Sequence, residues 1–185
     1  LNFCTVDLSA FYFDIRKDAL YCDSKDSDRR RGSIIVLNII LESLIKWFAP
    51  ILSFTTEEIY RLIDKDKKSI HLENFIEFPK VFENINLNKK WLELKKIRDI
   101  CNISIEAKRT AKEIGSSLES NLKISLNKDL YEISNHVDFA ELCITSSATV
   151  IKSTSEEVMV ETKKATGNKC PVCWKITQDK CERHS

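Results

Sequence analysis

Apolar side chains dominate the first part of the chain and recur at helical spacing. Residues 1–22 are dense in apolar and aromatic side chains and contain no helix breaker, which predicts a buried helix. Residues 34–48 are apolar on nearly every face, as expected for the central helix of a bundle, and this helix should stop before Pro50. The polar segment 24–33 predicts a loop, or a loop that runs into a helix start at Ser33.

The stretch FTTEEI, residues 54–59, has the pattern of a helix start. Thr55 can cap the helix, and Glu58 three residues later completes a capping box. Phe54 and Ile59 supply the apolar pair of a hydrophobic staple. A third helix is therefore predicted to begin here.

The next segment, residues 64–90, contains Pro79 and many Asn and Lys residues, and it predicts mostly loop. A long helix is then predicted over residues 91–113, ended by Gly115 as a C-terminal cap. Its apolar positions recur at steps of three and four: Trp91, Leu94, Ile97, Cys101 and Ile105.

The period changes from helical to alternating after the long helix. Residues 121–126 alternate apolar and polar side chains, which predicts a strand, and three more short strands are predicted at 141–146, 148–152 and 157–162. A short helix is predicted among them at residues 128–137.

These elements predict a mainly α protein in three parts. A helical bundle would span residues 1–114, a small α+β subdomain residues 115–165, and a cysteine-rich tail residues 166–185, with 166–169 as the hinge. The scarcity of Gly and Pro, three of each in 185 residues, fits long helices better than a turn-rich β sandwich.

Composition excludes some classes of protein. A hydrophobic content of 43% is enough for a real core, so wholesale disorder is not expected. The net charge of +1 does not by itself imply a polyanionic partner, although a local basic face can still bind nucleic acid. The longest apolar run, residues 34–41, is too short to span a bilayer, so no membrane partner is expected.

Four of the seven cysteines are scattered in apolar or mixed surroundings, which is typical of reduced thiols in a cytoplasmic protein. They are Cys4, Cys22, Cys101 and Cys143. The first residue is not Met and no signal peptide is visible, which suggests a piece of a longer protein.

The tail carries Cys170-x2-Cys173-x7-Cys181-x2-His184. Zinc prefers four tetrahedral Cys or His ligands, and a complete set indicates a structural rather than a catalytic site. A segment this short cannot bury a core, so metal binding would supply its folding free energy. Two other interpretations are a redox pair, which lacks the expected βαβ unit, and unliganded cysteines. His184 lies next to the last residue, where fraying competes with binding.

Trp174 directly follows the second cysteine, and two interpretations of it stay open. The ring can pack over the metal knuckle, or it can be a stacking platform for a nucleotide. Basic neighbours that would then contact phosphates are Lys169, Lys175, Lys180 and Arg183. Two upstream basic clusters, Arg29-Arg30-Arg31 and Lys108-Arg109, are interleaved with acids, so a solvated face is their default interpretation.

No catalytic centre is visible. The chain has no Gly-rich phosphate loop, no G-x-S-x-G or HExxH motif and no pattern of paired catalytic carboxylates. The sequence therefore favours a binding function over a catalytic one.

Several stretches together resemble the anticodon-binding region of bacterial isoleucyl-tRNA synthetases. They are FYFDIRKDALYCD (11–23), RRRGSIIVLNIILESLIKWFAPILSFTTEEIY (29–60), SIHLENF (69–75), WLELKKIRDICNISIEAKRTAKEIGSSLESNLKISL (91–126) and KCPVCW (169–174). The part around Pro50 recurs in valyl, leucyl and methionyl relatives. The first stretch, the IGSSLE segment and the KCPVCW tail distinguish the isoleucyl enzymes.

The resemblance implies a helical bundle of the class Ia synthetase type that grips the anticodon stem-loop of tRNA(Ile), followed by a small mixed subdomain and a zinc module. The parent enzyme would ligate isoleucine to tRNA(Ile) with ATP in a separate domain and would edit valine. The HIGH-like and KMSKS-like signatures of those parts are absent from this chain. ATP is therefore expected only in the missing catalytic domain, and the chain is expected to be a monomer.

Cys170, Cys173 and Cys181 match zinc cysteines of the family, and Trp174 matches an aromatic residue placed against the anticodon loop. His184 departs from the family pattern, which usually has a fourth cysteine. The residues expected to bind tRNA are Trp174, Lys175, Arg183, Arg29, Arg30, Lys108 and Arg109. Two alternatives remain: the equivalent region of a valyl- or leucyl-type synthetase, and a zinc-stapled protein-interaction module without an RNA role.

Overall fold

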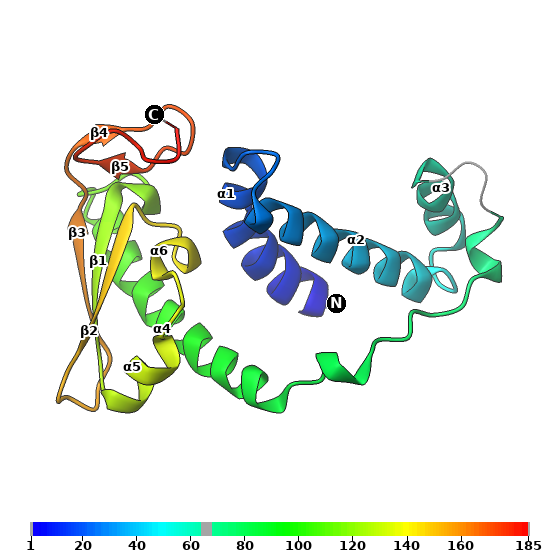
Figure 1. Cartoon of the computed structure of the whole chain (residues 1–185), viewed down its shortest axis with the longest axis horizontal. Coiled ribbons are helices and arrows are strands. Elements are labelled where there is room, and N and C mark those ends of the chain that lie inside the picture. Colours follow the sequence, from blue (N-terminus) through cyan, green and yellow to red (C-terminus); the bar gives the residue numbers. More distant parts are fainter. Residues whose placement is uncertain (1, 64–67, 185) are drawn as a thin grey trace. The chain divides into compact units, whose positions relative to one another are not determined.

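The computed structural model describes residues 2–63 and 68–184 (Figure 1). The chain forms two compact units: Leu1–Cys22 together with Asn84–Ser185, and Asp23–Glu83. The protein is mostly helical, with a small sheet region and a C-terminal Cys/His cluster, as the sequence predicts. Part of the predicted loop 64–90 falls on residues 64–67, which lie outside the described residues.

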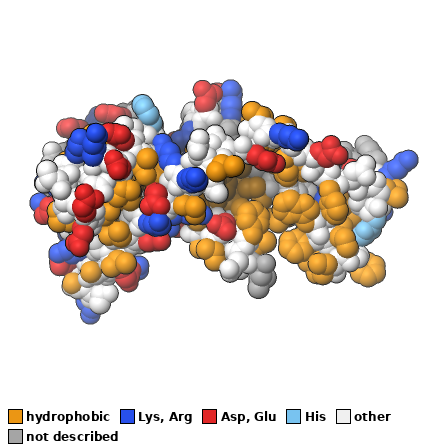
Figure 2. Space-filling view, turned by 90° about the horizontal axis from the view of Figure 1, so that it is seen from below, with side chains coloured by type: hydrophobic (Ala, Val, Ile, Leu, Met, Phe, Trp, Pro, Cys, Tyr) orange, Lys and Arg blue, Asp and Glu red, His pale blue; other side chains and the backbone are white. Residues whose placement is uncertain are grey.

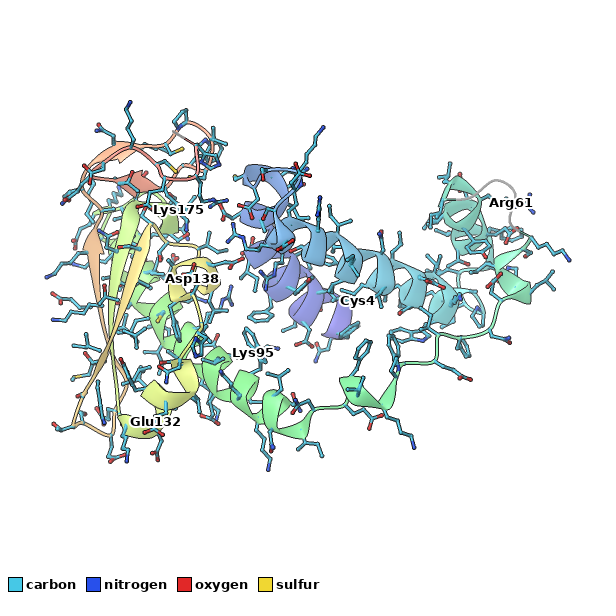
Figure 3. All side chains as sticks on the ribbon, viewed as in Figure 1. Cys4, Arg61, Lys95, Glu132, Asp138 and Lys175 are labelled. Atoms are coloured by element: carbon cyan, nitrogen blue, oxygen red, sulfur yellow. The ribbon has the colours of Figure 1, made fainter. Side chains whose placement is uncertain are left out.

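The first unit begins with a π-helix, η1 (Phe3–Phe13), that continues into α1 (Asp14–Cys22). The predicted helix is confirmed for the described residues, but its burial is limited to one stripe, formed by Leu8, Ile15 and Ala19. Two contacts join η1 to α4 (Ile85–Thr110). Phe11 meets Trp91 edge to face, and Lys95, labelled in Figure 3, extends from α4 so that its Nζ lies 2.8 Å from Asp7 Oδ1.

Helix α4 differs from its prediction at both ends. It begins at Ile85 rather than Trp91, because the Asn84 side chain caps it by accepting from the Leu87 N–H at 2.9 Å. It also ends before Gly115, since Lys112 at φ 57° takes the left-handed position that follows the helix.

The α+β part contains a short 3₁₀ turn η4 (Ser117–Glu119), strand β1 (Ser120–Leu126), helices α5 (Lys128–Ser134) and α6 (Phe139–Leu142), and strands β2 (Ser147–Lys152) and β3 (Met159–Lys164). The strands form a mixed sheet in the order β2-β1-β3. Strand β1 is parallel to β2, with Leu122 opposite Ala148, and antiparallel to β3, with Leu122 opposite Thr162.

One face of the sheet is buried and builds the main core. The alternating side chains of β1 that the sequence singles out, Leu122, Ile124 and Leu126, all point into this core. Helix α4 covers them, and its Ser104 hydroxyl bonds Thr162 Oγ1 at 2.7 Å. The other buried members of the core are Ile15, Leu94, Ile97, Cys101, Ile105, Ile114, Phe139, Leu142 and Cys143.

One predicted strand is wrong. Residues 141–146 contain the end of a single turn of helix, α6, and the turn that follows it, instead of an extended segment. Asp138 starts this turn, because its Oδ1 accepts from the Ala140 and Glu141 N–H groups at 2.8 and 3.1 Å. The strands predicted at 121–126, 148–152 and 157–162, and the helix at 128–137, are confirmed within a few residues.

The second unit contains α2 (Asp28–Phe48), α3 (Ser53–Ile63) and the 3₁₀ turns η2 (Ile70–Leu72) and η3 (Lys80–Phe82). Its small core holds Ile45, Ala49, Tyr60 and Ile70. Helix α2 starts at Asp28 with Ser27 as its cap, not at Ser33, so the segment predicted as loop is largely helix.

The expectation that α2 is a bundle centre is wrong for the described residues. Several of its apolar side chains are exposed, and Ile35 keeps 59% of its surface. Figure 2 shows hydrophobic side chains, in orange, on the molecular surface. Within the part of the chain that the structure describes, no helix has both the length and the apolarity needed to cross a membrane.

Helix α3 is confirmed, but its predicted capping box is wrong. Its first residue is Ser53, so Thr55 lies inside the helix rather than at its cap. The acid that matters is Glu57, not Glu58, because its Oε2 accepts from the Ile70 N–H and the Ser69 hydroxyl, both at 2.9 Å. The Arg61 side chain, together with these donors, lowers the pKa of Glu57.

Candidate metal centre

A small hairpin supports the tail. Strand β4 (Asn168–Lys169) pairs with β5 (Ile176–Thr177), and the connection carries the first two cysteines. Gly167 leads into β4 at φ 129°, and a Cβ at this position would lie 2.2 Å from the Thr177 carbonyl oxygen. The tail is attached to the α+β part where the Ile176 N–H donates to Ser146 Oγ at 2.7 Å.

Replacing Gly167 by alanine is expected to destabilise the tail, because both the backbone angle and the contact with Thr177 exclude a side chain. The strained angle alone costs roughly 1–3 kcal/mol. Gly32→Ala is the matched control, since a Cβ at this helical glycine meets nothing within 4 Å. Chemical denaturation and zinc titration of both variants measure the effect. A tail that binds zinc equally well in both would contradict this account.

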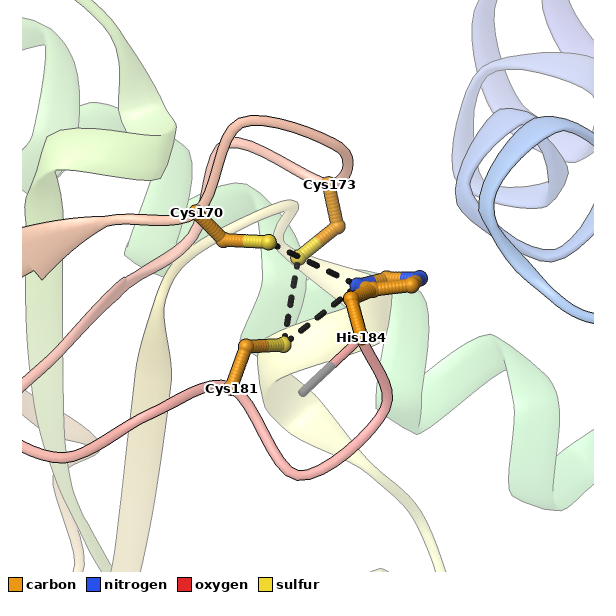
Figure 4. Close-up of side chains that lie close together, drawn as sticks. All are labelled: Cys170, Cys173, Cys181 and His184. Atoms are coloured by element: carbon orange, nitrogen blue, oxygen red, sulfur yellow. Dashed lines mark hydrogen bonds between the residues drawn. The ribbon is translucent and has the colours of Figure 1, made fainter.

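The four predicted ligands come together in the structure (Figure 4). Their ligand atoms all lie within 4.8 Å of one another, so the group can hold a metal ion. Tight turns present them: the Trp174 N–H donates to the Cys170 carbonyl, and the His184 N–H donates to the Cys181 carbonyl, both at 3.0 Å.

Three of the six distances between ligand atoms are short and similar. Cys173 Sγ lies 3.8 Å from Cys181 Sγ, and His184 Nδ1 lies 3.5 Å from Cys170 Sγ and 3.4 Å from Cys181 Sγ. The two knuckle cysteines are buried, and the other two ligands are half-buried. The arrangement is a closed set of three sulfur atoms and one nitrogen atom.

The second ring nitrogen of His184 fixes which tautomer is present. Nε2 lies 2.7 Å from the backbone carbonyl oxygen of Cys22, the last residue of α1. A carbonyl oxygen can only accept, so in the neutral ring Nε2 carries the proton and Nδ1 keeps a lone pair for a cation. Metal-binding histidines commonly hold their free N–H in this way.

The electrostatics of the cluster favour cysteine ionisation unevenly. The N–H groups of Cys173 and Val172 lower the pKa of Cys170 to about 6. Burial raises the pKa of Cys173 to about 11. The hydrogen bond to the Cys22 carbonyl raises the pKa of His184, because that bond favours the protonated ring. Burial disfavours the charged thiolate form of a cysteine. A bound cation would offset this cost, because its positive charge favours the deprotonated form of the coordinating thiols.

The redox interpretation finds no support in the geometry. A reactive Cys-x-x-Cys pair sits at the N-terminus of a helix, which lowers the pKa of its first thiol. Residues 170–175 form turns and coil instead, and Cys181 and His184 close around the same pair. A metal clip accounts for all four side chains.

Trp174 lies beside the cluster without covering it completely. The residue is 58% exposed, and its backbone holds a φ of 62° that is unusual for an aromatic residue. Lys169 Nζ lies 5.5 Å from the ring centroid, a cation–π distance. Together with α1 and α6, the ring lines a cavity of about 390 Å³ that also contacts Tyr21 and Lys175.

The other residues expected to bind RNA are distributed over three places. Lys175 lies beside Trp174 in the tail, and Arg183 Nη1 lies 2.8 Å from Asp18 Oδ2. Arg29 and Arg30 belong to the second unit, where Arg29 makes a two-fold ion pair with Asp23 at 2.7 Å.

The remaining pair stands at the end of α4. Lys108 bonds Glu113 and Arg109 bonds Glu106, each with a closest distance of 2.8 Å. Sequence analysis missed Asp18 and the Cys22 carbonyl at the metal centre. An acid one turn into a helix and a main-chain oxygen carry no motif.

The family model for the anticodon-binding domain of tRNA ligases matches residues 1–126. The chain belongs to this family. The match covers η1, helices α1 to α4 and the first strand, and it ends before α5, α6 and the metal centre.

Curated relatives cover the anticodon-binding domain and the tail together. Isoleucine–tRNA ligase of Pelagibacter ubique is 73% identical over 185 residues, which is 100% of this chain and 20% of that protein. The enzymes of the same name from Agrobacterium fabrum and Methylacidiphilum infernorum are 41% and 42% identical over 97% and 95% of this chain. The chain thus spans about a fifth of the length of these relatives.

Proposed function

We propose that this chain recognises the anticodon stem-loop of tRNA(Ile) as the C-terminal region of an isoleucine–tRNA ligase. The observation that carries the proposal is the combination of the anticodon-binding family match with relatives of that one specificity over nearly the whole chain. In this proposal the longer protein, a cytoplasmic monomer, ligates isoleucine to tRNA(Ile) with ATP. The chain described here contributes RNA binding.

We further propose that the metal is zinc and that its role is structural. A tetrahedral zinc ion with bonds of about 2.3 Å to sulfur and about 2.0 Å to nitrogen sets ligands roughly 3.8 Å apart between two sulfurs and roughly 3.5 Å between sulfur and nitrogen. Three of the six ligand separations, 3.8, 3.5 and 3.4 Å, agree with these edges, and all six are within 4.8 Å. His184 Nδ1 would therefore serve as the fourth ligand, in place of the cysteine that is usual in the family.

Trp174 is proposed as the stacking platform for an unpaired base. Its exposed ring, its position next to a ligand and the ammonium group of Lys169 support this role. The metal would fix the turn that carries the ring, so the base would meet a surface that is already ordered. Lys175 lies beside the ring and would contact phosphate.

The remaining predicted contacts are proposed with a condition. Arg183, Arg29, Lys108 and Arg109 all pair with acidic side chains, while Arg30 donates to the Asp23 carbonyl at 3.0 Å. An exposed ion pair contributes little free energy in water, so its basic side chain can readily leave the acid and bind a phosphate instead. The side chains of Arg183 and Arg29 keep only 29% and 31% of their surface exposed, so these two residues would instead act mainly by holding their own segments.

Trp174→Ala is expected to weaken tRNA(Ile) binding by about tenfold to a hundredfold, since base stacking contributes roughly 1–3 kcal/mol. Val172→Ala is the matched control, because this apolar side chain lies in the same turn and is 50% exposed. Gel retardation or fluorescence anisotropy at a fixed salt concentration would measure both. Zinc content must stay unchanged in both variants.

Four results would contradict parts of the proposal. Equal tRNA binding by the Trp174 and Val172 variants would exclude the stacking role. Equal affinity for tRNAs that differ only in the anticodon would remove the specificity for tRNA(Ile), whereas preference for a valine or leucine anticodon would assign the chain to another synthetase. A chain that retards no tRNA at low salt would instead be a protein-interaction module.

A further inference from the structure

Three contacts join the C-terminal end of α1 to the metal-binding tail, and they come from residues 150 to 165 positions apart in sequence. His184 Nε2 contacts the Cys22 carbonyl at 2.7 Å, and Arg183 Nη1 contacts Asp18 Oδ2 at 2.8 Å. The Cys22 thiol lies 3.7 Å from the Val172 carbonyl, inside the knuckle turn. We call these three contacts the clasp.

The clasp uses groups that the helix itself leaves available. The last four carbonyl groups of an α-helix have no intrahelical partner, and Cys22 is the last residue of α1. Asp18 lies one turn earlier, so both contacts fall on one face of the helix. The side chains of Arg183 and Asp18 keep only 29% and 20% of their surface exposed, which limits screening of their ion pair by solvent.

His184 takes part in both the clasp and the metal centre. Its Nδ1 faces two cluster thiols, while its Nε2–H caps α1. A cation held at Nδ1 makes the ring more positive, and the negative end of the helix dipole stabilises positive charge at this place. Binding on one side of the ring therefore strengthens the contact on the other.

We propose that the metal centre clasps α1: metal binding orders the last turn of α1 against the tail, and Asp18 and the Cys22 carbonyl position His184 for the metal. The effect must be reciprocal, because two equilibria that share one group change each other by the same factor. The inference rests on the proposed zinc site and extends it to a helix at the opposite end of the chain.

The first test separates metal retention from the clasp. His184→Cys keeps four ligands, but a thiolate has no second donor for the Cys22 carbonyl. The variant is expected to retain zinc near one equivalent. The amides of residues 19–22 in the zinc-loaded full chain should then exchange hydrogen about tenfold faster than in the unchanged protein, as expected for loss of one charge-assisted hydrogen bond.

The second test measures positioning by Asp18. Asp18→Asn is expected to weaken zinc binding about tenfold in competition with a chelator. Asp14→Asn is the matched control, because this acid lies on the same helix and pairs locally with Lys17 at 2.8 Å. It should leave zinc affinity unchanged.

The outcomes are distinguishable from those of the proposed function. If the protein without substitutions binds no zinc, both the proposed zinc site and the clasp are overturned. If the protein binds zinc, but the amides of residues 19–22 exchange hydrogen equally fast with and without zinc, only the clasp is overturned. Equal zinc affinity of the Asp18 and Asp14 variants would do the same, even if His184→Cys failed to load metal.

Discussion

Replacing Cys173 by serine is expected to release the metal and unfold the tail while the sheet and α4 remain folded. The hairpin β4–β5 has only two residues in each strand, so it cannot supply a core of its own. Structural zinc contributes about 10–16 kcal/mol in isolated zinc-finger peptides, and a hydroxyl does not replace a thiolate in this set. Metal analysis, together with hydrogen exchange over residues 168–184, would measure the loss.

Cys4→Ser is the control for this variant. Cys4 lies in η1, labelled in Figure 3, and it is not one of the four ligands. It should retain the metal and the protection of the tail. If the serine variant at position 173 also retained one equivalent of metal, Cys173 would not be a ligand and the cluster would have to be reassigned.

Replacing Phe139 by alanine is expected to lower the free energy of unfolding of the first unit by about 3–5 kcal/mol. The Phe139 side chain keeps 2% of its surface and belongs to the core between α4 and the sheet. Truncation leaves a cavity that close-packed neighbours fill only in part.

Urea denaturation followed by circular dichroism would measure this change. Phe54→Ala is the matched control, because the Phe54 side chain keeps 92% of its surface. Its effect should stay within about 0.5 kcal/mol. Comparable losses in the two variants would mean that α6 does not anchor the core.

The parts of the fold that sequence predicts are those whose periodicity comes from burial. Strand β1 alternates because one face of the sheet is covered, and the inward positions of α4 recur because that helix covers it. The same logic fails for α2, whose apolar side chains predict burial that the described residues do not provide. Apolarity indicates that a face avoids water, but it does not say what covers that face.

Element ends and local turns were predicted less well, because short-range hydrogen bonds decide them. Asp138 converts a predicted strand into the helical turn α6, and Lys112 takes the left-handed position expected of Gly115. Several residues compete for each of these roles, and sequence alone does not show which one wins.

The convergence of the four Cys and His side chains was predictable, because four such donors at short spacing have few other uses. The roles of Trp174 and the basic residues stay predictions, since exposure and charge are compatible with more than one partner. The neighbours of His184 were beyond sequence analysis, because a contact over 162 positions leaves no local pattern.

The 162 positions between Cys22 and His184 also determine the order in which the two sides of the clasp are made during synthesis. Ribosomes add about 5–20 residues per second, so roughly ten to thirty seconds pass between the emergence of Cys22 and that of His184. During this interval the last turn of α1 has no tail to cap it. Within the first unit, α1 is thus made well before the tail, and its last turn reaches its final hydrogen bonding only after the tail has been made.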